Sequence, residues 1–283
     1  MGIVDTHFHV WDPAARDHAW LTGMPALNRR FGIEDFEDVA RQNNVTDAVL
    51  VQVLNDSGDT RDFLAIADTH PVVAGVVGWV PLEASDVPDQ IAALRESPGG
   101  GRLVSIRHLI QDEPDDSYAS RASVIAGVRA VGEAGLAFDL VIRAHQLPAA
   151  TALVRAVPDC RFVLDHGAKP PLLGGGSLDA WEREVAELAQ LENVTCKLSG
   201  LVTEAGEGWR QMDVRRSFAH LLESFGTDRV MFGSDWPVCT AVASYEEVLG
   251  LCQEALAELS ASEREAALAN NARRIYRLSE AGA

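Results

Sequence analysis

Along this chain of 283 residues, eight short runs of apolar, largely β-branched residues alternate with longer segments whose apolar residues recur at helical spacing. No other feature limits the possible folds as strongly. The runs are mostly continuous in their apolar character, which is typical of strands buried on both faces of a parallel sheet. They cover Ile3–His7, Ala48–Leu54, Val73–Val80, Leu103–Arg107, Ala137–Arg143, Arg161–Asp165, Val194–Ser199 and Arg229–Ser234.

The longer segments predict amphipathic helices. The clearest one begins after Ser177, a residue type that caps helices, and carries Trp181 and Val185 on one apolar face. A closing helix is expected over Ser262–Leu278, because Ser260 has the spacing of a capping box with Glu263. The helices that follow the strands are expected over Glu34–Asn44, Thr60–His70, Val87–Ser97, Arg121–Glu133, Leu147–Val157, Leu178–Glu192, Met212–Phe225 and Tyr245–Leu259.

Eight strand–helix units in succession predict an α/β fold, a single (β/α)8 TIM barrel with an extra C-terminal helix. An open doubly wound sheet is the alternative. The first strand is not followed by the glycine pattern of dinucleotide-binding folds, and no P-loop motif occurs, so nucleotide chemistry is not indicated. No linker-like stretch separates the units, and we expect residues 1–283 to form one domain.

The composition argues against several other classes of protein. A formal net charge of −18 repels phosphate backbones and anionic lipids, so neither a nucleic acid nor a membrane is expected as a partner. The longest apolar run, Val72–Leu82, is too short for a membrane span, and no basic region followed by an apolar stretch indicates secretion. The four cysteines are far apart and form no metal-binding or disulfide pattern, so a cytoplasmic protein is expected.

In a TIM barrel the active site lies at the carboxyl ends of the strands, and this chain concentrates its histidines and lysines there. Five of the eight histidines and the only two lysines, Lys169 and Lys197, fall at or just after predicted strand ends. All other cationic side chains are arginines. Either this bias is chance, or the two lysine sites need a compact ammonium group that a planar guanidinium cannot replace.

A metal-binding arrangement is predicted at these strand ends. His7 and His9 are two residues apart at the mouth of the first strand, so both side chains can point to the same side. With His166 and Asp235 from two later strand ends, they predict a site for one divalent metal ion, with zinc as the first candidate. Each residue also has a purely structural interpretation, since single histidines often pack in cores and Asp235 could bond a turn before Pro237.

Six fragments of the sequence carry a resemblance to a known family. They are Val4-Asp5-Thr6-His7-Phe8-His9, Ile106-Arg107-His108, Gln111-Asp112-Glu113-Pro114, Leu164-Asp165-His166-Gly167-Ala168-Lys169-Pro170-Pro171, Cys196-Lys197-Leu198-Ser199-Gly200-Leu201 and Phe232-Gly233-Ser234-Asp235-Trp236-Pro237. In this order they resemble the amidohydrolase superfamily, in its branch of fuconolactonase- and rhamnonolactonase-type sugar lactonases. The resemblance spans nearly the whole chain and implies hydrolysis of a sugar (aldono-) lactone, of the L-fucono or L-rhamnono type, to the aldonic acid.

The resemblance also implies a site centred on His7, His9, His166 and Asp235, which serve as catalytic residues and as metal ligands. A metal ion or the three histidines polarise the lactone carbonyl, and Asp235 as general base takes a proton from the attacking water. Members with two metal ions carry a bridging lysine or glutamate at the end of the fourth strand, where this chain has Arg107. One metal ion is therefore expected, and a metal-independent mechanism stays open.

Further side chains at the strand ends are expected to bind the hydroxyl groups and the nascent carboxylate of the substrate. Arg107 and Lys197 have pairing with core acids such as Asp139 as their alternative role, and Trp236 has core packing. The expected substrate-binding residues are Arg107, His108, Lys169, Lys197, Arg143, His145 and Trp236.

Two other classes of function stay open at this level. One is a different reaction on the same barrel, such as hydrolysis of a dicarboxylate lactone or non-oxidative decarboxylation of an aromatic acid. A dicarboxylate calls for several arginines, and only Arg107 and Arg143 stand at predicted strand ends. The other class is a non-catalytic binder of sugars or metals, which has no need of a base at Asp235. The expected partner is a small sugar lactone, and the sequence indicates no oligomeric state.

Overall fold

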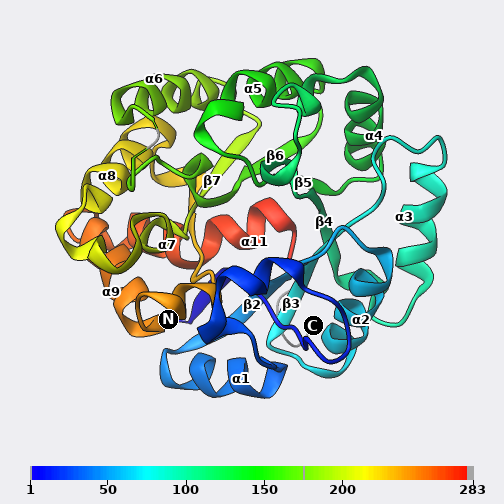
Figure 1. Ribbon diagram of the computed structural model, residues 1–283, viewed down its shortest axis with the longest axis horizontal. Helices are drawn as coiled ribbons and strands as arrows, with labels where there is room; N and C mark the ends of the chain where they lie inside the picture. Colours follow the sequence, from blue (N-terminus) through cyan, green and yellow to red (C-terminus); the bar gives the residue numbers. More distant parts are fainter. Residues whose placement is uncertain (1, 175, 279–283) are drawn as a thin grey trace.

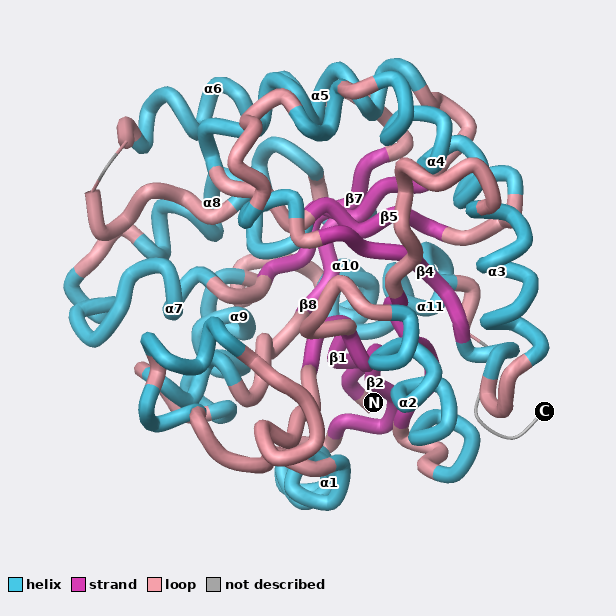
Figure 2. Tube along the Cα trace, turned by 45° about the vertical axis from the view of Figure 1, so that its right-hand side comes forward, coloured by secondary structure: helices cyan, strands magenta, loops and turns pink. Residues whose placement is uncertain are grey.

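Every predicted apolar run forms a strand, and the strands pair in chain order as one parallel sheet. We describe a computed structural model that covers residues 2–174 and 176–278. The strands are β1 (Ile3–Phe8), β2 (Val45–Val51), β3 (Val73–Gly78), β4 (Leu103–His108), β5 (Ala137–Leu140), β6 (Arg161–Leu164), β7 (Val194–Leu198) and β8 (Val230–Phe232). They occupy the centre of the molecule, with helices around them (Figure 2).

The sheet closes on itself where the chain continues beyond β8. The backbone N–H of Asp235 donates to the carbonyl of His7 at 2.8 Å, and that of His9 donates to the carbonyl of Trp236 at 2.7 Å. Phe8 and Trp236 form a parallel bridge at the same place. These contacts confirm the predicted (β/α)8 barrel and bring the first and last strands, more than 200 residues apart in sequence, side by side.

The predicted helices surround the barrel (Figure 1). The Ser177 hydroxyl accepts from the N–H of Ala180, and Ser260 forms the predicted capping box with Glu263. The short helix α7 was not predicted. The helices are α1 (Ile33–Gln42), α2 (Ser57–Thr69), α3 (Val87–Glu96), α4 (Ala122–Glu133), α5 (Leu147–Ala156), α6 (Leu178–Ala189), α7 (Leu201–Ala205), α8 (Val214–Phe225), α9 (Tyr245–Ala255), α10 (Ala261–Glu265) and α11 (Asn271–Tyr276).

The predicted closing helix is divided into α10, a π-helical segment at Ala266–Asn270, and α11. In Figure 1, α11 lies in the middle of the ring of helices. Its residues Ala272, Ile275 and Tyr276 belong to a buried cluster with apolar side chains of the barrel strands, which shows that the C-terminal segment packs against the barrel interior. Within the described ranges, no helix combines the length and apolar character needed to cross a membrane.

Candidate active site

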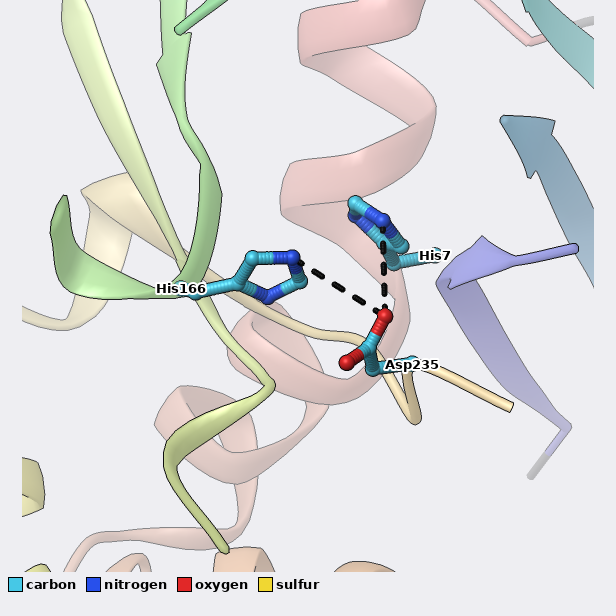
Figure 3. A group of neighbouring side chains, drawn as sticks. All are labelled: His7, His166 and Asp235. Carbon is cyan, nitrogen blue, oxygen red and sulfur yellow. Dashed lines mark ion pairs between the residues drawn. The ribbon is translucent and has the colours of Figure 1, made fainter. Parts of the chain in front are cut away.

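Four of the predicted residues meet at the centre of the barrel. Oδ1 of Asp235 lies 3.7 Å from Nε2 of His7, 3.5 Å from Nε2 of His9 and 3.9 Å from Nε2 of His166. The two Nε2 atoms of His7 and His9 are 3.2 Å apart. All four side chains are buried. Figure 3 shows the His7 and His166 rings facing the same oxygen of the Asp235 carboxylate. The structure thus brings together the histidines and the aspartate that the sequence placed at three different strand ends.

The backbone and its neighbours orient each of these side chains. Nδ1 of His9 is 2.7 Å from the carbonyl oxygen of Val51, and Nδ1 of His166 is 2.8 Å from the hydroxyl of Ser199. His166 and Asp235 both have left-handed backbones, with φ of 53° and 59°. Residues other than glycine rarely adopt this conformation, and such strain is typical of functional sites.

Gly200 allows the close approach of β7 to His166. It has a φ of 67°, and a Cβ atom built at this position would lie 2.4 Å from Nδ1 of His166. Both the backbone angle and the contact therefore require glycine. The glycine keeps the imidazole of His166 beside Ser199 and turned toward Asp235.

A layer of buried ion pairs supports His7 from inside the barrel. Nζ of Lys197 lies 2.6 Å from Asp139 and 2.9 Å from Asp165, and Nη1 of Arg107 donates to Asp165 at 2.9 Å. Both cations also reach the His7 ring, with Lys197 3.2 Å from Nδ1 and Arg107 3.3 Å from Nε2. The two acids balance the two bases, which makes burial of this layer possible.

Hydroxyl groups complete this layer around Asp139. Ser105 donates to this carboxylate at 2.6 Å and Tyr276 of α11 donates at 2.7 Å. Burial raises the pKa of Asp139, against the opposing charge of Lys197. Burial also favours a higher pKa for Asp165, but Lys197 and His7 outweigh it and hold that pKa well below its ordinary value.

The histidines and the central aspartate have opposite charge preferences. Burial, together with the nearby Lys197 charge, lowers the pKa of His7 well below its ordinary value. Burial lowers the pKa of His166 to about 4, although Asp235 opposes the shift. Burial alone would raise the pKa of Asp235, but the nearby His166, together with His9 and His7, lowers it below its ordinary value. At neutral pH the site therefore holds neutral His7 and His166 rings around an ionised carboxylate.

The donor set fits one divalent metal ion. A carbonyl oxygen only accepts, so the bond to Val51 fixes the proton of neutral His9 on Nδ1 and leaves a lone pair on Nε2. That lone pair, a nitrogen of His7 and Oδ1 of Asp235 converge on one point. Bonds of about 2.0–2.2 Å in a tetrahedral zinc site separate ligand atoms by about 3.3–3.6 Å, close to the 3.2 Å between His7 and His9 and the 3.5–3.9 Å between Asp235 and the three histidines.

His7, His166 and Asp235 also form a cluster whose ligand atoms lie within 4.8 Å of one another. Arg107 is the competing partner of this set, because its Nη1 already lies 3.3 Å from Nε2 of His7. The residues could thus hold a metal ion, in competition with a guanidinium group for one of the imidazole lone pairs.

Three of these four residues, His9, His166 and Asp235, line a cavity of about 360 Å³, a volume suited to a small molecule. His9, His166, Arg107 and Asp235 form its floor. Apolar side chains of Trp20, Met24, Val53, Leu109, Val141 and Val238 contribute to its wall, with polar ones from Gln111, Asp112, Arg143, Lys169, Thr203 and Glu204.

Three of the expected substrate-binding residues line this cavity, namely Arg107, Lys169 and Arg143. Nζ of Lys169 is paired with Glu204 at 2.8 Å. Nε of Arg143 donates to the carbonyl of Gln111 at 3.2 Å. Both cations are therefore held in place by protein acceptors while they face the pocket.

The other expected substrate-binding residues lie elsewhere. His108 pairs with Glu113 and stacks on Tyr118, because successive side chains of β4 point to opposite faces and Arg107 takes the inner one. Trp236 is likewise the outward neighbour of Asp235 and packs against Phe31 and Phe36. Core packing, the alternative for this tryptophan, is what the structure shows.

Lys197 lies deeper in the barrel than expected, and His145 lies farther out. Lys197 is fully buried beneath His7 instead of lying at the mouth, and the alternative pairing with Asp139 is observed. His145 is exposed, pairs with Asp116 and lines a neighbouring cavity. A strand-end position in the sequence does not show how far along the barrel axis a side chain lies.

Several site residues carried no signal that sequence reasoning could use. Trp20, Thr203 and Glu204 come from connections whose course is set by the fold, and Tyr276 comes from the closing helix. Gln111 stood in a motif of the predicted resemblance, but without a role.

Comparisons with known proteins agree with this geometry. A family model described as Amidohydrolase matches residues 4–278. The chain is 39% identical to an L-fucono-1,5-lactonase of Burkholderia ambifaria over 236 residues, 83% of this chain and 80% of that protein. An L-fucono-1,5-lactonase of Burkholderia multivorans is 35% identical over 289 aligned residues, 98% of this chain and 96% of that protein.

A crystal structure of an amidohydrolase from Burkholderia multivorans with bound zinc has the same fold. Its TM-score to this structure is 0.92 at 33% sequence identity, with 99% of this chain and 100% of that chain covered. The sequence and structure matches together confirm the family resemblance predicted from the strand-end motifs.

Proposed function

The chain belongs to the amidohydrolase family, and on that premise we propose that it hydrolyses the cyclic ester of a sugar lactone, with an L-fucono-1,5-lactone as the first candidate. The observation that carries the proposal is the Asp235 carboxylate, which lies within 3.5–3.9 Å of three buried histidines and lines a cavity of about 360 Å³. The similarity to two L-fucono-1,5-lactonases supports the choice of substrate.

Asp235 is the proposed general base. It lines the cavity and stays ionised, so it accepts a proton from the water that attacks the lactone carbonyl. When the tetrahedral intermediate collapses, the C–O bond of the ring breaks and Asp235 returns this proton to the leaving ring oxygen. The products are a hydroxyl group and a carboxylic acid, which releases its proton to solvent and leaves the open aldonate.

Positive charge at the floor stabilises the oxyanion. Arg107 lines the cavity and is fixed by Asp165 and by the backbone carbonyl of Gln52, so its guanidinium is preorganised. We further propose one divalent ion, zinc first, held by His7, His9, His166 and Asp235. When bound there, it supplies Lewis acidity toward the carbonyl and the attacking water. The zinc-bound relative supports this assignment.

The test is a pH-indicator assay of proton release across a panel of aldonolactones, corrected for enzyme-free hydrolysis. Enzyme treated with a chelator is compared with enzyme resupplied with zinc, and the metal content is measured directly. We expect turnover of L-fucono-1,5-lactone and a loss of at least 100-fold in kcat for Asp235→Asn, as is usual when a general base is removed. Absence of lactone turnover in both metal-loaded and metal-free enzyme would refute the proposal.

A non-catalytic binder gives a different result in the same experiment. A binder keeps its affinity for the sugar acid in Asp235→Asn and releases no proton in either form. Calorimetric titration of both forms with the open aldonate distinguishes the two classes.

A further inference from the structure

Three side chains of the cavity wall hold polar atoms that lack hydrogen-bond partners. Nε1 of Trp20, Oε1 of Gln111 and Oγ1 of Thr203 are shielded from solvent, and none finds a partner among residues 2–174 and 176–278. All three residues line the cavity above Asp235. Such atoms are uncommon in native proteins, because a buried polar group without a partner loses its hydrogen bonds to water and gains none.

These residues come from three connections on the carboxyl side of the barrel. Trp20 lies in the 3-10 turn Ala19–Gly23 that follows β1, Gln111 in the 3-10 turn Ile110–Asp112 that follows β4, and Thr203 in α7 after β7. Since β1, β4 and β7 are spread around the closed sheet, the three side chains approach the cavity from different sides.

The fold fixes each of them in position. The Trp20 ring packs edge to face on Trp11, with centroids 5.0 Å apart. The backbone N–H of Gln111 donates to Val141 at 3.1 Å, and its side-chain Nε2 faces Asp112, which leaves Oε1 as the unused end of the amide. The backbone carbonyl of Thr203 accepts the N–H of Gly206 at the end of the helix, and the Thr203 hydroxyl has no partner among the described residues.

The chemistry of the three atoms defines what satisfies them. An indole N–H only donates, an amide oxygen only accepts, and a threonine hydroxyl does both. A ligand that satisfies all three must offer an oxygen acceptor toward one wall and hydroxyl protons toward another. A polyhydroxylated ring offers both oxygen acceptors and hydroxyl protons on several edges, whereas an aromatic acid or an aliphatic lactone without hydroxyl groups does not.

We propose that Trp20, Gln111 and Thr203 form the part of the pocket that selects the hydroxyl pattern of the ligand. This inference rests on the proposed function for the identity of the ring as a lactone. Asp235, His166 and Arg107 act on the ester group, while the three wall residues bind ring hydroxyls and discriminate against rings that lack them. A site built to bind a hydroxyl group rejects the deoxy analogue because its own polar atom is then left unpaired.

The experiment pairs three near-isosteric variants with a set of substrates. Gln111→Met, Thr203→Val and Trp20→Phe are assayed on a hydroxylated aldonolactone and on each of its monodeoxy analogues. Each variant is expected to lose about 10- to 100-fold in kcat/KM on the full lactone, but less than about 3-fold on the one analogue that lacks its partner hydroxyl. Met212→Leu is the control, because Met212 is exposed and does not line the cavity.

Binding of the open aldonate and its deoxy analogues is measured by calorimetry on the same proteins. Equal losses of kcat/KM and affinity across all analogues, or no loss in any of the three variants, would overturn the inference. Lactone turnover by the wild type would still leave the proposed function in place. If the wild type turns over no lactone but the variants still lose affinity in the hydroxyl-specific pattern, the proposed function fails and the inference stands. A thermal melt of each variant confirms that it is folded.

Discussion

Replacing Lys197 by methionine removes one cation from a buried layer in which two bases balance two acids. Lys197 lies 2.6 Å from Asp139 and 2.9 Å from Asp165, and all three side chains are fully buried. Breaking a buried ion pair by removing one partner costs about 3–5 kcal/mol, because the other charge stays in a medium of low polarity. Methionine keeps most of the side-chain volume, so a cavity adds little to this cost.

The contacts that remain place the expected cost near the lower end of that range. Asp139 keeps its bonds from Ser105 and Tyr276, and Asp165 keeps Arg107 at 2.9 Å. We therefore expect Lys197→Met to lower the free energy of unfolding by about 3 kcal/mol at pH 7. Since Lys197 opposes the raised pKa of Asp139, that pKa rises further in the variant.

A pH signature and a double variant make this prediction specific. A carboxyl group whose folded pKa is raised destabilises the protein when ionised, and this cost is relieved as the pH falls through the folded pKa. The stability deficit of Lys197→Met should accordingly shrink as the pH falls from 7 through the raised pKa of Asp139. Lys197→Met with Asp139→Asn restores the charge balance and should cost at least about 2 kcal/mol less than the sum of the two single variants.

Equilibrium urea unfolding, followed by tryptophan fluorescence, measures all four proteins. The midpoint should fall in both single variants with an unchanged dependence on urea concentration. A cost below about 1 kcal/mol for Lys197→Met, or additive costs in the double variant, would show that the layer does not act as a balanced buried network.

Three further predictions test other parts of the structure. Burial lowers the pKa of His166 from 6.5 to about 4, so its contribution to stability is complete above pH 6.5 and is lost as the pH falls toward 4. From pH 7 to pH 5 the free energy of unfolding of the wild type, measured in urea, should fall by about 2 kcal/mol more than that of His166→Asn. Parallel pH curves for the two proteins would contradict this prediction. Burial raises the pKa of Asp59 from 3.8 to about 6, so the ionised carboxyl costs stability above pH 6 and the cost disappears as the pH falls toward 3.8. Asp59→Asn should therefore be more stable than the wild type by about 2 kcal/mol at pH 7 and should have no advantage at pH 4. If the variant is less stable than the wild type at pH 7, the surrounding groups compensate the charge of Asp59. Gly200→Ala puts a Cβ 2.4 Å from Nδ1 of His166 and should reduce kcat/KM at least about 10-fold, whereas Gly208→Ala, whose Cβ meets nothing within 4 Å, should have wild-type activity.

The eight strands, the capped helices and the central cluster could be predicted because their signals are local in the chain. Apolar runs and helical spacing identify the elements, and the two-residue period of a strand places His7 and His9 on one side. Since the carboxyl ends of all strands in a barrel meet at one face, His166 and Asp235 follow from topology without any knowledge of distances. These arguments need only the order of elements.

The direction and depth of side chains could be decided only by the tertiary structure. A strand buried on both faces has no alternation of polar and apolar residues, so nothing in Leu103–His108 shows that Arg107 points inward and His108 outward. For the same reason Lys197 could not be assigned to the buried layer, although Asp139 was a possible partner.

The wall of the cavity depends on the fold even more strongly. Trp20, Gln111 and Thr203 lie on connections, and connections have no periodicity that could indicate where they run. These residues come to line one cavity only because the closed sheet brings β1, β4 and β7 around a common axis. The sequence determined which residues stand at the strand ends, and the packing of the barrel decided which of them share a pocket, because distance and direction arise only when all eight strands are closed together.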